Sequence, residues 1–268
     1  MSKYEVRGKN VLITGAASGI GREFCSLFAA DGANLALDDL PAKKDVLAQW
    51  AKELADKYNV NTWSFHIDLS TENGPEQLYA SAKAAAGSID MLMNNAGTLE
   101  YGNFADIDYA RQVSMVKTNA LALLKLTWLA LQDMKKAGSG RIINLSSCSA
   151  FQPTIYHAAY GASKAFVQSL SEAVNAELSG SDIKVFAFSP PYTKTPLLKA
   201  ANLPEKLRWF AISGLWDPAV IAKQGYKAFK QGKATFIPGA VNWLMHSVIV
   251  RLTPHNLLNM ISKTMMKG

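Results

Sequence analysis

Short apolar runs alternate with longer stretches of helical length along most of the chain. The apolar runs end in polar, glycine or proline positions, which is typical of buried strands; they cover residues 10–15, 33–39, 61–68, 88–97, 140–147 and 183–190. Segments with helical length and periodicity lie between them, at residues 22–30, 43–58, 74–86, 109–136 and 158–179. This alternation predicts a parallel sheet with helices on both faces, which binds ligands at the carboxyl ends of its strands.

The pattern changes after residue 190. Residues 197–212 are predicted to form a helical insertion, 217–230 a helix with an Asp-Pro start, and 234–239 a short seventh strand. We therefore expect a Rossmann-like, doubly wound α/β domain of three layers over residues 1–240. Its substrate-loop insertion covers about 192–216, and an apolar, basic helical extension covers 241–268.

Composition narrows the function classes. Of the 268 residues, 49% are hydrophobic and 18% charged, so a sizeable core is available. The formal net charge of +7 suits an anionic cofactor or an anionic membrane surface. The lysines are scattered without an arginine-rich block, so no nucleic-acid partner is expected. Cys25 and Cys148 lack metal-type spacing and are expected to be buried free thiols, with no metal site.

No apolar signal region follows Met1, and no uncharged apolar run approaches the roughly 18 residues that a membrane-spanning helix needs. We expect a cytoplasmic protein. Peripheral membrane association through the tail stays open as an alternative.

The first strand leads directly into "TGAASGIG", residues 14–21, and then into a helix. The glycines at 15, 19 and 21 permit a tight turn and the close approach of backbone N–H groups to a pyrophosphate. Strand, glycine turn and helix in this order predict a dinucleotide site.

Two carboxylates, Asp38 and Asp39, end the second strand. One of them is expected to accept hydrogen bonds from the adenosine ribose, which favours NAD over NADP because a carboxylate repels a 2′-phosphate. Alternation with Leu35 and Leu37 favours Asp39, while Asp38 stays open. Asp68, after the third strand, is expected to meet the adenine amino group.

Small and amide residues follow the fourth strand in "NNAG", residues 94–97. Asn119 lies among apolar neighbours within a predicted helix, where asparagine is unfavourable. A buried asparagine needs partners, so Asn119 is either satisfied structurally or part of a water relay.

The stretch "YHAAYGASK", residues 156–164, contains two tyrosines and a lysine at helical spacing. Positions i and i+4 share a helix face, which predicts one row of Tyr156, Tyr160 and Lys164. A free tyrosine has a pKa near 10, and an ammonium one turn away favours the phenolate. Ser147, thirteen residues before Tyr160, could hold a substrate oxygen against the phenol.

Together these motifs resemble the short-chain dehydrogenase/reductase family. "TGAASGIG" is similar to its TGxxxGxG turn, "NNAG" to its fourth-strand motif, and Tyr160 and Lys164 to its YxxxK pair, with Ser147 and Asn119 at matching spacing. The resemblance covers about residues 8–197.

The resemblance implies a catalytic set of Asn119, Ser147, Tyr160 and Lys164. Tyr160 would be the general acid/base, Lys164 would lower its pKa, Ser147 would orient the reacting oxygen, and Asn119 would hold a water. It further implies an NAD site; the residues assigned to this site are Gly15, Ser18, Gly19, Ile20, Gly21, Asp39, Asp68, Leu69, Asn95, Ala96, Gly97, Tyr160, Lys164, Pro190, Thr193 and Thr195.

The chain departs from the family pattern at two places. Pro190-Pro191 stands where Pro-Gly is usual, which removes a backbone N–H beside the expected nicotinamide position. The end of the chain lacks the glycine-rich finish of tetrameric members. Its tail, residues 241–266, is interpreted as an interfacial membrane helix, a subunit contact or a flap over the substrate. The expected assembly is a homo-dimer or tetramer.

An apolar substrate pocket is expected near residues 99–104, 148–157 and 197–216; the residues assigned to it are Phe151, Ile155, Tyr156 and Tyr192. They favour a hydrophobic, lipid-like alcohol or ketone, unless they only pack the insertion onto the domain. His66 and His157 are not assigned to catalysis.

The leading hypothesis is an NAD-dependent enzyme that interconverts a secondary alcohol and a ketone. The alternatives are a non-catalytic cofactor-binding regulator or scaffold, and an epimerase or dehydratase that retains its NAD. A non-catalytic protein has no physical need of all four catalytic residues.

Overall fold

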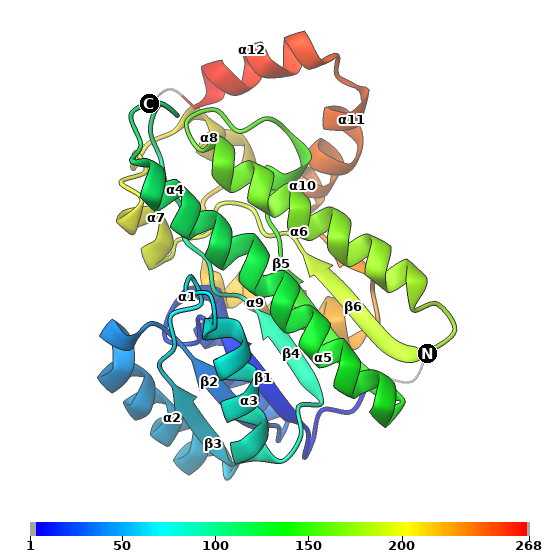
Figure 1. Ribbon diagram of the computed structural model, residues 1–268. Helices are drawn as coiled ribbons and strands as arrows, with labels where there is room; N and C mark the ends of the chain where they lie inside the picture. The colour runs from blue at the N-terminus through cyan, green and yellow to red at the C-terminus, as the bar shows by residue number, and fades with distance from the viewer. Residues whose placement is uncertain (1–3, 267–268) are drawn as a thin grey trace.

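Seven parallel strands form one sheet in the order β3-β2-β1-β4-β5-β6-β7 (Figure 1). The computed structural model describes residues 4–266. The strands are β1 (Asn10–Thr14), β2 (Asn34–Asp38), β3 (Thr62–Phe65), β4 (Met91–Asn94), β5 (Ser139–Leu145), β6 (Asp182–Phe188) and β7 (Thr235–Phe236). The predicted Rossmann-like, doubly wound class is confirmed.

Helices cover both faces of this sheet. They are α1 (Gly19–Ala30), α2 (Lys44–Tyr58), α3 (Gly74–Ala86), α4 (Tyr109–Val116), α5 (Leu123–Ala137), α6 (Ala158–Glu177), α7 (Pro196–Ala200), α8 (Arg208–Ser213), α9 (Pro218–Lys230), α10 (Ala240–Leu244), α11 (Val250–Leu252) and α12 (His255–Met265). Short 3-10 turns are η1 (Pro41–Lys43) and η3 (Cys148–Phe151), and π-helical turns are η2 (Lys117–Ala122) and η4 (Met245–Ile249).

The core has two halves because successive strand residues point to opposite faces. Val11 and Ile13 of β1 pack with α1, α2 and α9, whereas Leu12 packs with α3 and α5 on the other face. The strands are therefore apolar on both sides, as parallel sheets require.

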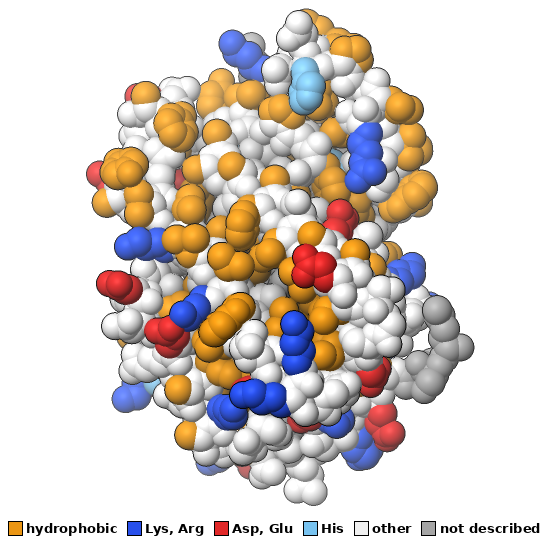
Figure 2. All heavy atoms as spheres, turned by 45° about the vertical axis from the view of Figure 1, so that its right-hand side comes forward, with side chains coloured by type: hydrophobic (Ala, Val, Ile, Leu, Met, Phe, Trp, Pro, Cys, Tyr) orange, Lys and Arg blue, Asp and Glu red, His pale blue; other side chains and the backbone are white. Residues whose placement is uncertain are grey.

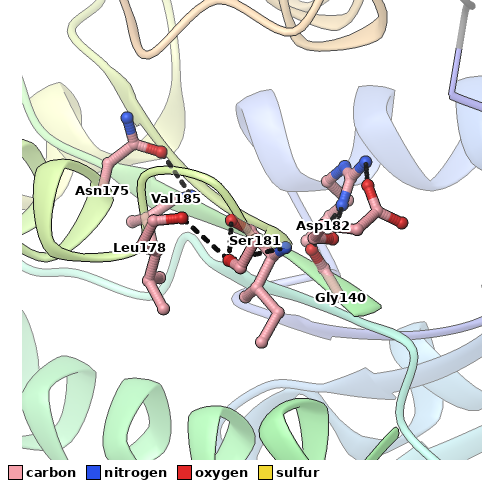
Figure 3. Close-up of polar contacts among 8 residues, drawn as sticks. Gly140, Asn175, Leu178, Ser181, Asp182 and Val185 are labelled. Carbon is pink, nitrogen blue, oxygen red and sulfur yellow. Dashed lines mark hydrogen bonds and ion pairs between the residues drawn. The ribbon is translucent and has the colours of Figure 1, made fainter. Parts of the chain in front are cut away.

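The turn from α6 into β6 is fixed by side chains (Figure 3). The Ser181 hydroxyl donates to the carbonyl oxygen of Leu178 at 2.8 Å, and Asn175 Oδ1 accepts from the Val185 N–H at 3.0 Å. These contacts fix the start of β6. They therefore also fix the position of its carboxyl end and of the residues that follow Phe188.

The helical insertion predicted over 197–212 consists of two short helices. α7 and α8 are separated by residues 201–207. Pro204 explains the break, because its ring and missing N–H interrupt helical hydrogen bonding. The tail breaks again at Pro254, between α11 and α12.

Cys25 and Cys148 are buried free thiols, as expected. Between residues 4 and 266, no helix combines the length and apolar character needed to cross a membrane.

Candidate functional site

The site lies at the carboxyl ends of β1 and β4, the neighbouring strands where the helices change from one face of the sheet to the other. The loops after these strands are tied together. Asn95 Nδ2 donates to the carbonyl oxygens of Thr14 and Gly15, each at 2.9 Å. Thr14 Oγ1 accepts from the N–H groups of Asn95 at 3.1 Å and Ala96 at 3.0 Å. Asn95 thus shapes the glycine turn from within.

The glycine turn leaves space and N–H donors for a phosphate. Gly19 has φ +57°, a left-handed conformation that side chains disfavour, and a side chain at Gly21 would overlap the Asn95 amide. Helix α1 begins at Gly19, and Ser18 at its N-cap makes no side-chain capping bond. The first-turn N–H groups, including that of Ile20, have no partner within the helix and fit a dinucleotide pyrophosphate.

Asp39, rather than Asp38, faces this turn. Asp39 Oδ2 accepts from the Ala17 N–H at 2.9 Å, and Oδ1 lies 3.2 Å from Lys43 Nζ. Lys43 Nζ also donates to Ser18 Oγ at 3.3 Å. Asp38 accepts from the Ile67 N–H at 3.0 Å within the sheet, and burial raises its pKa to about 8. Asp38 is therefore a structural residue of β2.

Asp68 and Leu69 follow β3. Asp68 Oδ1 accepts from the Ser70 N–H at 2.8 Å, which closes a local turn, and Leu69 is buried. This turn leads into α3 and keeps both residues near the end of β2.

Ser147, Tyr160 and Lys164 meet at the carboxyl end of β5. Lys164 is buried, and its Nζ donates to the Leu145 carbonyl oxygen at 2.7 Å and lies 5.8 Å from the centre of the Tyr160 ring. Ser146 Oγ donates to the Lys164 carbonyl oxygen at 2.9 Å, which fixes α6 against the end of the strand.

Burial controls the proton affinities of this pair. It raises the pKa of Tyr160 to about 12, against the opposing effect of the Ser147 hydroxyl beside it. It lowers the pKa of Lys164 to about 8. Desolvation is thus the dominant influence on the pKa of the phenol, which carries its proton at neutral pH.

Asn119 is satisfied by protein groups. Its Nδ2 donates to the Thr98 carbonyl oxygen and its Oδ1 accepts from the Thr98 N–H, both at 2.9 Å. Nδ2 also lies 3.3 Å from Ser163 Oγ. The residue sits in the π-helical turn η2, and it holds the loop containing Gly97 beside Lys164 Nζ.

The segment after β6 returns to the glycine turn. The Pro190 carbonyl oxygen accepts from the Cys148 N–H at 3.0 Å, and Thr193 Oγ1 donates to the Pro191 carbonyl oxygen at 2.8 Å. The Thr195 methyl group lies against Gly19, where an added Cβ would be 3.0 Å away. The Pro-Pro pair therefore still places Thr195 against the glycine turn.

An apolar cluster lies next to the predicted catalytic residues. Ile155, Tyr156 and Tyr192 are half-buried against a core of Leu203, Leu207, Trp209 and Met266. Because Met266 comes from the tail, one face of the tail covers the candidate substrate region. Phe151 is not part of this cluster: it lines a groove together with Trp243 and Arg251, and its ring also packs against that of His246.

The predicted row of Tyr156, Tyr160 and Lys164 on one helix is wrong. Helix α6 begins at Ala158, and Tyr156 precedes it with φ +66°. This left-handed conformation directs Tyr156 toward Tyr101, with ring centres 5.8 Å apart. His157 at the N-cap lies beside Tyr160 instead: its Nε2 is 3.3 Å from the Tyr192 hydroxyl, and burial lowers its pKa to about 4.

Three residues near the site were not identified from the sequence. Lys43 pairs with Asp39, while Gln152 and His246 line a small recess together with Ser147. The spacing of Lys43 from Asp39, four residues, could have indicated the first contact. Nothing local indicates His246, which comes from the tail. Within residues 4–266, no three His, Cys, Asp or Glu side chains are grouped as metal ligands would be.

Comparison with known proteins agrees with this geometry. The family model for short chain dehydrogenases matches residues 9–206. The chain belongs to the short-chain dehydrogenase family. It is therefore an oxidoreductase with an NAD(P)-binding Rossmann fold, and the resemblance drawn from its motifs is confirmed.

Individual relatives fall within the same family. Oxidoreductase UcpA from Salmonella typhimurium is 32% identical over 197 residues, which cover 73% of each chain. A short-chain dehydrogenase from Sphingobium yanoikuyae, solved in complex with NADPH, has a TM-score of 0.80 and 28% identity, and the match covers 96% of this chain and 95% of that one.

A third similar structure is the bulky-bulky ketone specific alcohol dehydrogenase from Comamonas testosteroni. Its TM-score is 0.76 and its identity 27%, over 91% of this chain and 92% of that one.

Proposed function

We propose that this short-chain dehydrogenase interconverts a secondary alcohol and a ketone with NAD as cofactor, on a hydrophobic substrate. The observation that carries the proposal is the meeting of Ser147, Tyr160 and Lys164, with Lys164 beside the loop that contains Gly97. The description of the Comamonas relative as a ketone-specific alcohol dehydrogenase supports the reaction class.

The cofactor site is assigned to the glycine turn, the ends of β2 to β4 and the segment after β6. When bound, the dinucleotide supplies or accepts the hydride. Gly15, Ser18, Gly19, Ile20 and Gly21 would hold the pyrophosphate. The remaining contacts are assigned to Asp39, Asp68, Leu69, Asn95, Ala96, Gly97, Pro190, Thr193 and Thr195.

The chain's own residues manage the proton and the reacting oxygen. In the reductive direction, the Tyr160 phenol donates its proton to the carbonyl oxygen, and Ser147 donates a hydrogen bond to the same atom. The Lys164 ammonium stabilises the phenolate that remains. Asn119 acts as a positioning residue, because it fixes the loop that faces Lys164.

Replacing Tyr160 tests the reaction. Tyr160→Phe removes only the transferable proton, so kcat should fall by about a hundredfold or more while NAD binding and thermal stability are kept. NADH absorbance with an alcohol or a ketone measures turnover. Tyr109→Phe is the matched control, since it deletes an exposed phenol outside the catalytic group and the substrate pocket. Unchanged turnover in Tyr160→Phe would reject the assignment.

The cofactor preference is assigned to Asp39. Its carboxylate lies at the glycine turn and would repel a 2′-phosphate, which favours NAD. Lys43 partly neutralises it, at 3.2 Å. The preference for NAD over NADP is therefore expected to be moderate, and the NADPH complex of a similar protein keeps NADP as a candidate.

The two alternative functions make different measurable claims. A non-catalytic regulator would bind NAD without producing NADH from any alcohol. An epimerase or dehydratase would turn over substrate without net NADH. The buried Lys164 beside Tyr160 favours the dehydrogenase, because burying an ammonium is costly without a function.

Two surfaces carry the proposed assembly and membrane contact. Helices α5 and α6 lie side by side (Figure 1). Exposed apolar side chains of η2, α5 and α6 suit a second copy of the chain; they are Leu121, Leu124, Trp128 and Phe166. A second group covers the tail; it comprises Val241, Trp243, Leu244, Ile249, Leu252, Leu257, Met260 and Ile261. Figure 2 shows hydrophobic and basic side chains together in the region of α11 and α12.

The tail surface is assigned to an anionic lipid surface. No Asp or Glu follows Asp217 in the sequence, while Arg251 and Lys263 flank the exposed apolar groups. Like charge disfavours pairing of two such tails, whereas anionic headgroups complement them.

A further inference from the structure

A recess beside Ser147 contains buried polar atoms that lack partners. Its seven lining residues are Ser147, Cys148, Ser149, Gln152, Tyr192, Trp209 and His246, and none of them is charged. Among the described residues, Gln152 Oε1 and both ring nitrogens of His246 are buried without a hydrogen-bond partner. His246 is 1% exposed. Unpaired buried polar groups are costly, so a ligand that pairs with them gains affinity.

His246 packs against two aromatic rings. The centre of its ring lies 6.1 Å from the ring centre of Phe151 and 6.1 Å from that of Trp209. The π-helical turn η4 carries the residue, and this kind of turn is frequent at functional sites. The tail thereby adds an imidazole to a recess that also contains the side chains of Ser147, Ser149 and Gln152.

The chemistry of the recess selects its ligand. Burial lowers the pKa of His246 to about 4, so the imidazole is neutral and offers one N–H donor and one acceptor. Gln152 Oε1 only accepts. A hydroxyl group can accept from the imidazole N–H and donate to Gln152 at the same time. A carboxylate would meet no cation here, and the recess admits one small polar group.

We propose that Gln152 and His246 form a specificity subsite for a hydroxyl group on the substrate, one or two carbons from the carbonyl carbon that reacts at Ser147. The inference rests on the proposed function and deepens it: the substrate class becomes hydrophobic hydroxy ketones and the corresponding diols. The short separation follows because Ser147 lines the same narrow recess as His246.

Matched ketones test the subsite. α-Hydroxypropiophenone is compared with isobutyrophenone, in which a methyl group replaces the hydroxyl, and β-hydroxypropiophenone is compared with butyrophenone. In the unmodified protein, kcat/KM from NADH oxidation should favour one hydroxylated member by about tenfold or more. His246→Phe, which keeps an aromatic ring in contact with Phe151 and Trp209, should abolish the preference and keep activity on the apolar ketone.

Two further variants distinguish loss of the subsite from a failure of His246→Phe to fold. Gln152→Leu should also reduce the preference, and His246→Gln should restore part of it because it retains a donor and an acceptor. Equal turnover of both members of each pair, or a preference that survives in His246→Phe, would overturn the subsite and leave the oxidoreductase intact.

Binding separates the subsite from the reaction. Trp209 lines the recess, so its fluorescence should change with the hydroxy ketone, and Trp209→Phe identifies the signal. Binding that depends on His246 without any NADH oxidation would support the subsite and reject the proposed reaction. Neither binding nor turnover would overturn both.

Discussion

At the scale of single residues, the proposed chemistry depends on a few groups whose pKa values are set by burial and by their neighbours. Tyr160 keeps its proton at neutral pH because burial outweighs the hydroxyl of Ser147. Asp39 and Lys43 form an ion pair at the glycine turn. The carboxylate is expected to repel a 2′-phosphate and the ammonium to attract it. Their individual contributions can be measured separately.

Reciprocal substitutions at this pair should move the cofactor preference in opposite directions. Asp39→Ala removes the repulsion and leaves the cation, so the ratio of kcat/KM for NAD to that for NADP should fall by about tenfold or more. Lys43→Ala leaves the carboxylate unscreened, so the ratio should rise. An unchanged ratio in both variants would show that neither residue discriminates the two cofactors.

At the scale of elements, the end of β2 illustrates how a buried carboxyl group shapes a strand. Asp38 Oδ1 accepts from the Ile67 N–H at 3.0 Å, which links β2 to the residues after β3. Burial, together with the neighbouring Asp39 and Asp68, raises the pKa of Asp38 to about 8. The folded protein therefore binds this proton more tightly than the unfolded chain, whose aspartate pKa is about 3.9.

The free energy of unfolding should thus fall as pH rises from about 4 to about 8 on account of Asp38. Asp38→Asn keeps the acceptor oxygen and removes the titratable group. Between pH 5 and pH 8, the free energy of unfolding of this variant should therefore decrease by roughly 1–3 kcal/mol less than that of the unmodified protein. Urea unfolding at both pH values measures this. His157 and His246, whose lowered pKa values act in the opposite direction, are present in both proteins and cancel. An identical pH dependence would contradict the assignment.

At the scale of the whole molecule, one face of the tail packs against the candidate substrate region and the other face is exposed to solvent. Met266 and Met265 pack toward Tyr101, Tyr156 and Tyr192, while Trp243 and Leu252 face outward. These packing contacts support the interpretation of the tail as a flap over the substrate. The outward face of the tail is the part assigned to lipid.

Two single substitutions should separate lipid contact from self-association. Leu252→Glu should reduce sedimentation with vesicles of anionic phosphatidylserine and leave the size in solution unchanged. Trp128→Glu should reduce the assembly size and leave vesicle binding unchanged, because α5 is a different surface. High salt should weaken vesicle binding by the unmodified protein. If Leu252→Glu changes the assembly size instead, the tail is a subunit contact.

Features encoded by neighbouring residues were predictable from the sequence alone. The sheet, the glycine turn and the Tyr160–Lys164 spacing depend on strand alternation and on helical i, i+4 geometry, which are local. The same reasoning failed at Tyr156. This residue precedes α6 in a left-handed conformation, and the sequence contains no glycine at that position that would have indicated it.

Only the tertiary structure decided which distant groups share the site and what their protons do. It brought His246 from the tail to Gln152 and Ser147, assigned Asp38 to the sheet and Asp39 to the turn, and set the pKa of Tyr160 through burial. Desolvation and contacts between distant segments arise only once the chain is packed. The sequence therefore determined the fold and the catalytic motif, whereas packing decided the electrostatics and the shape of the substrate site.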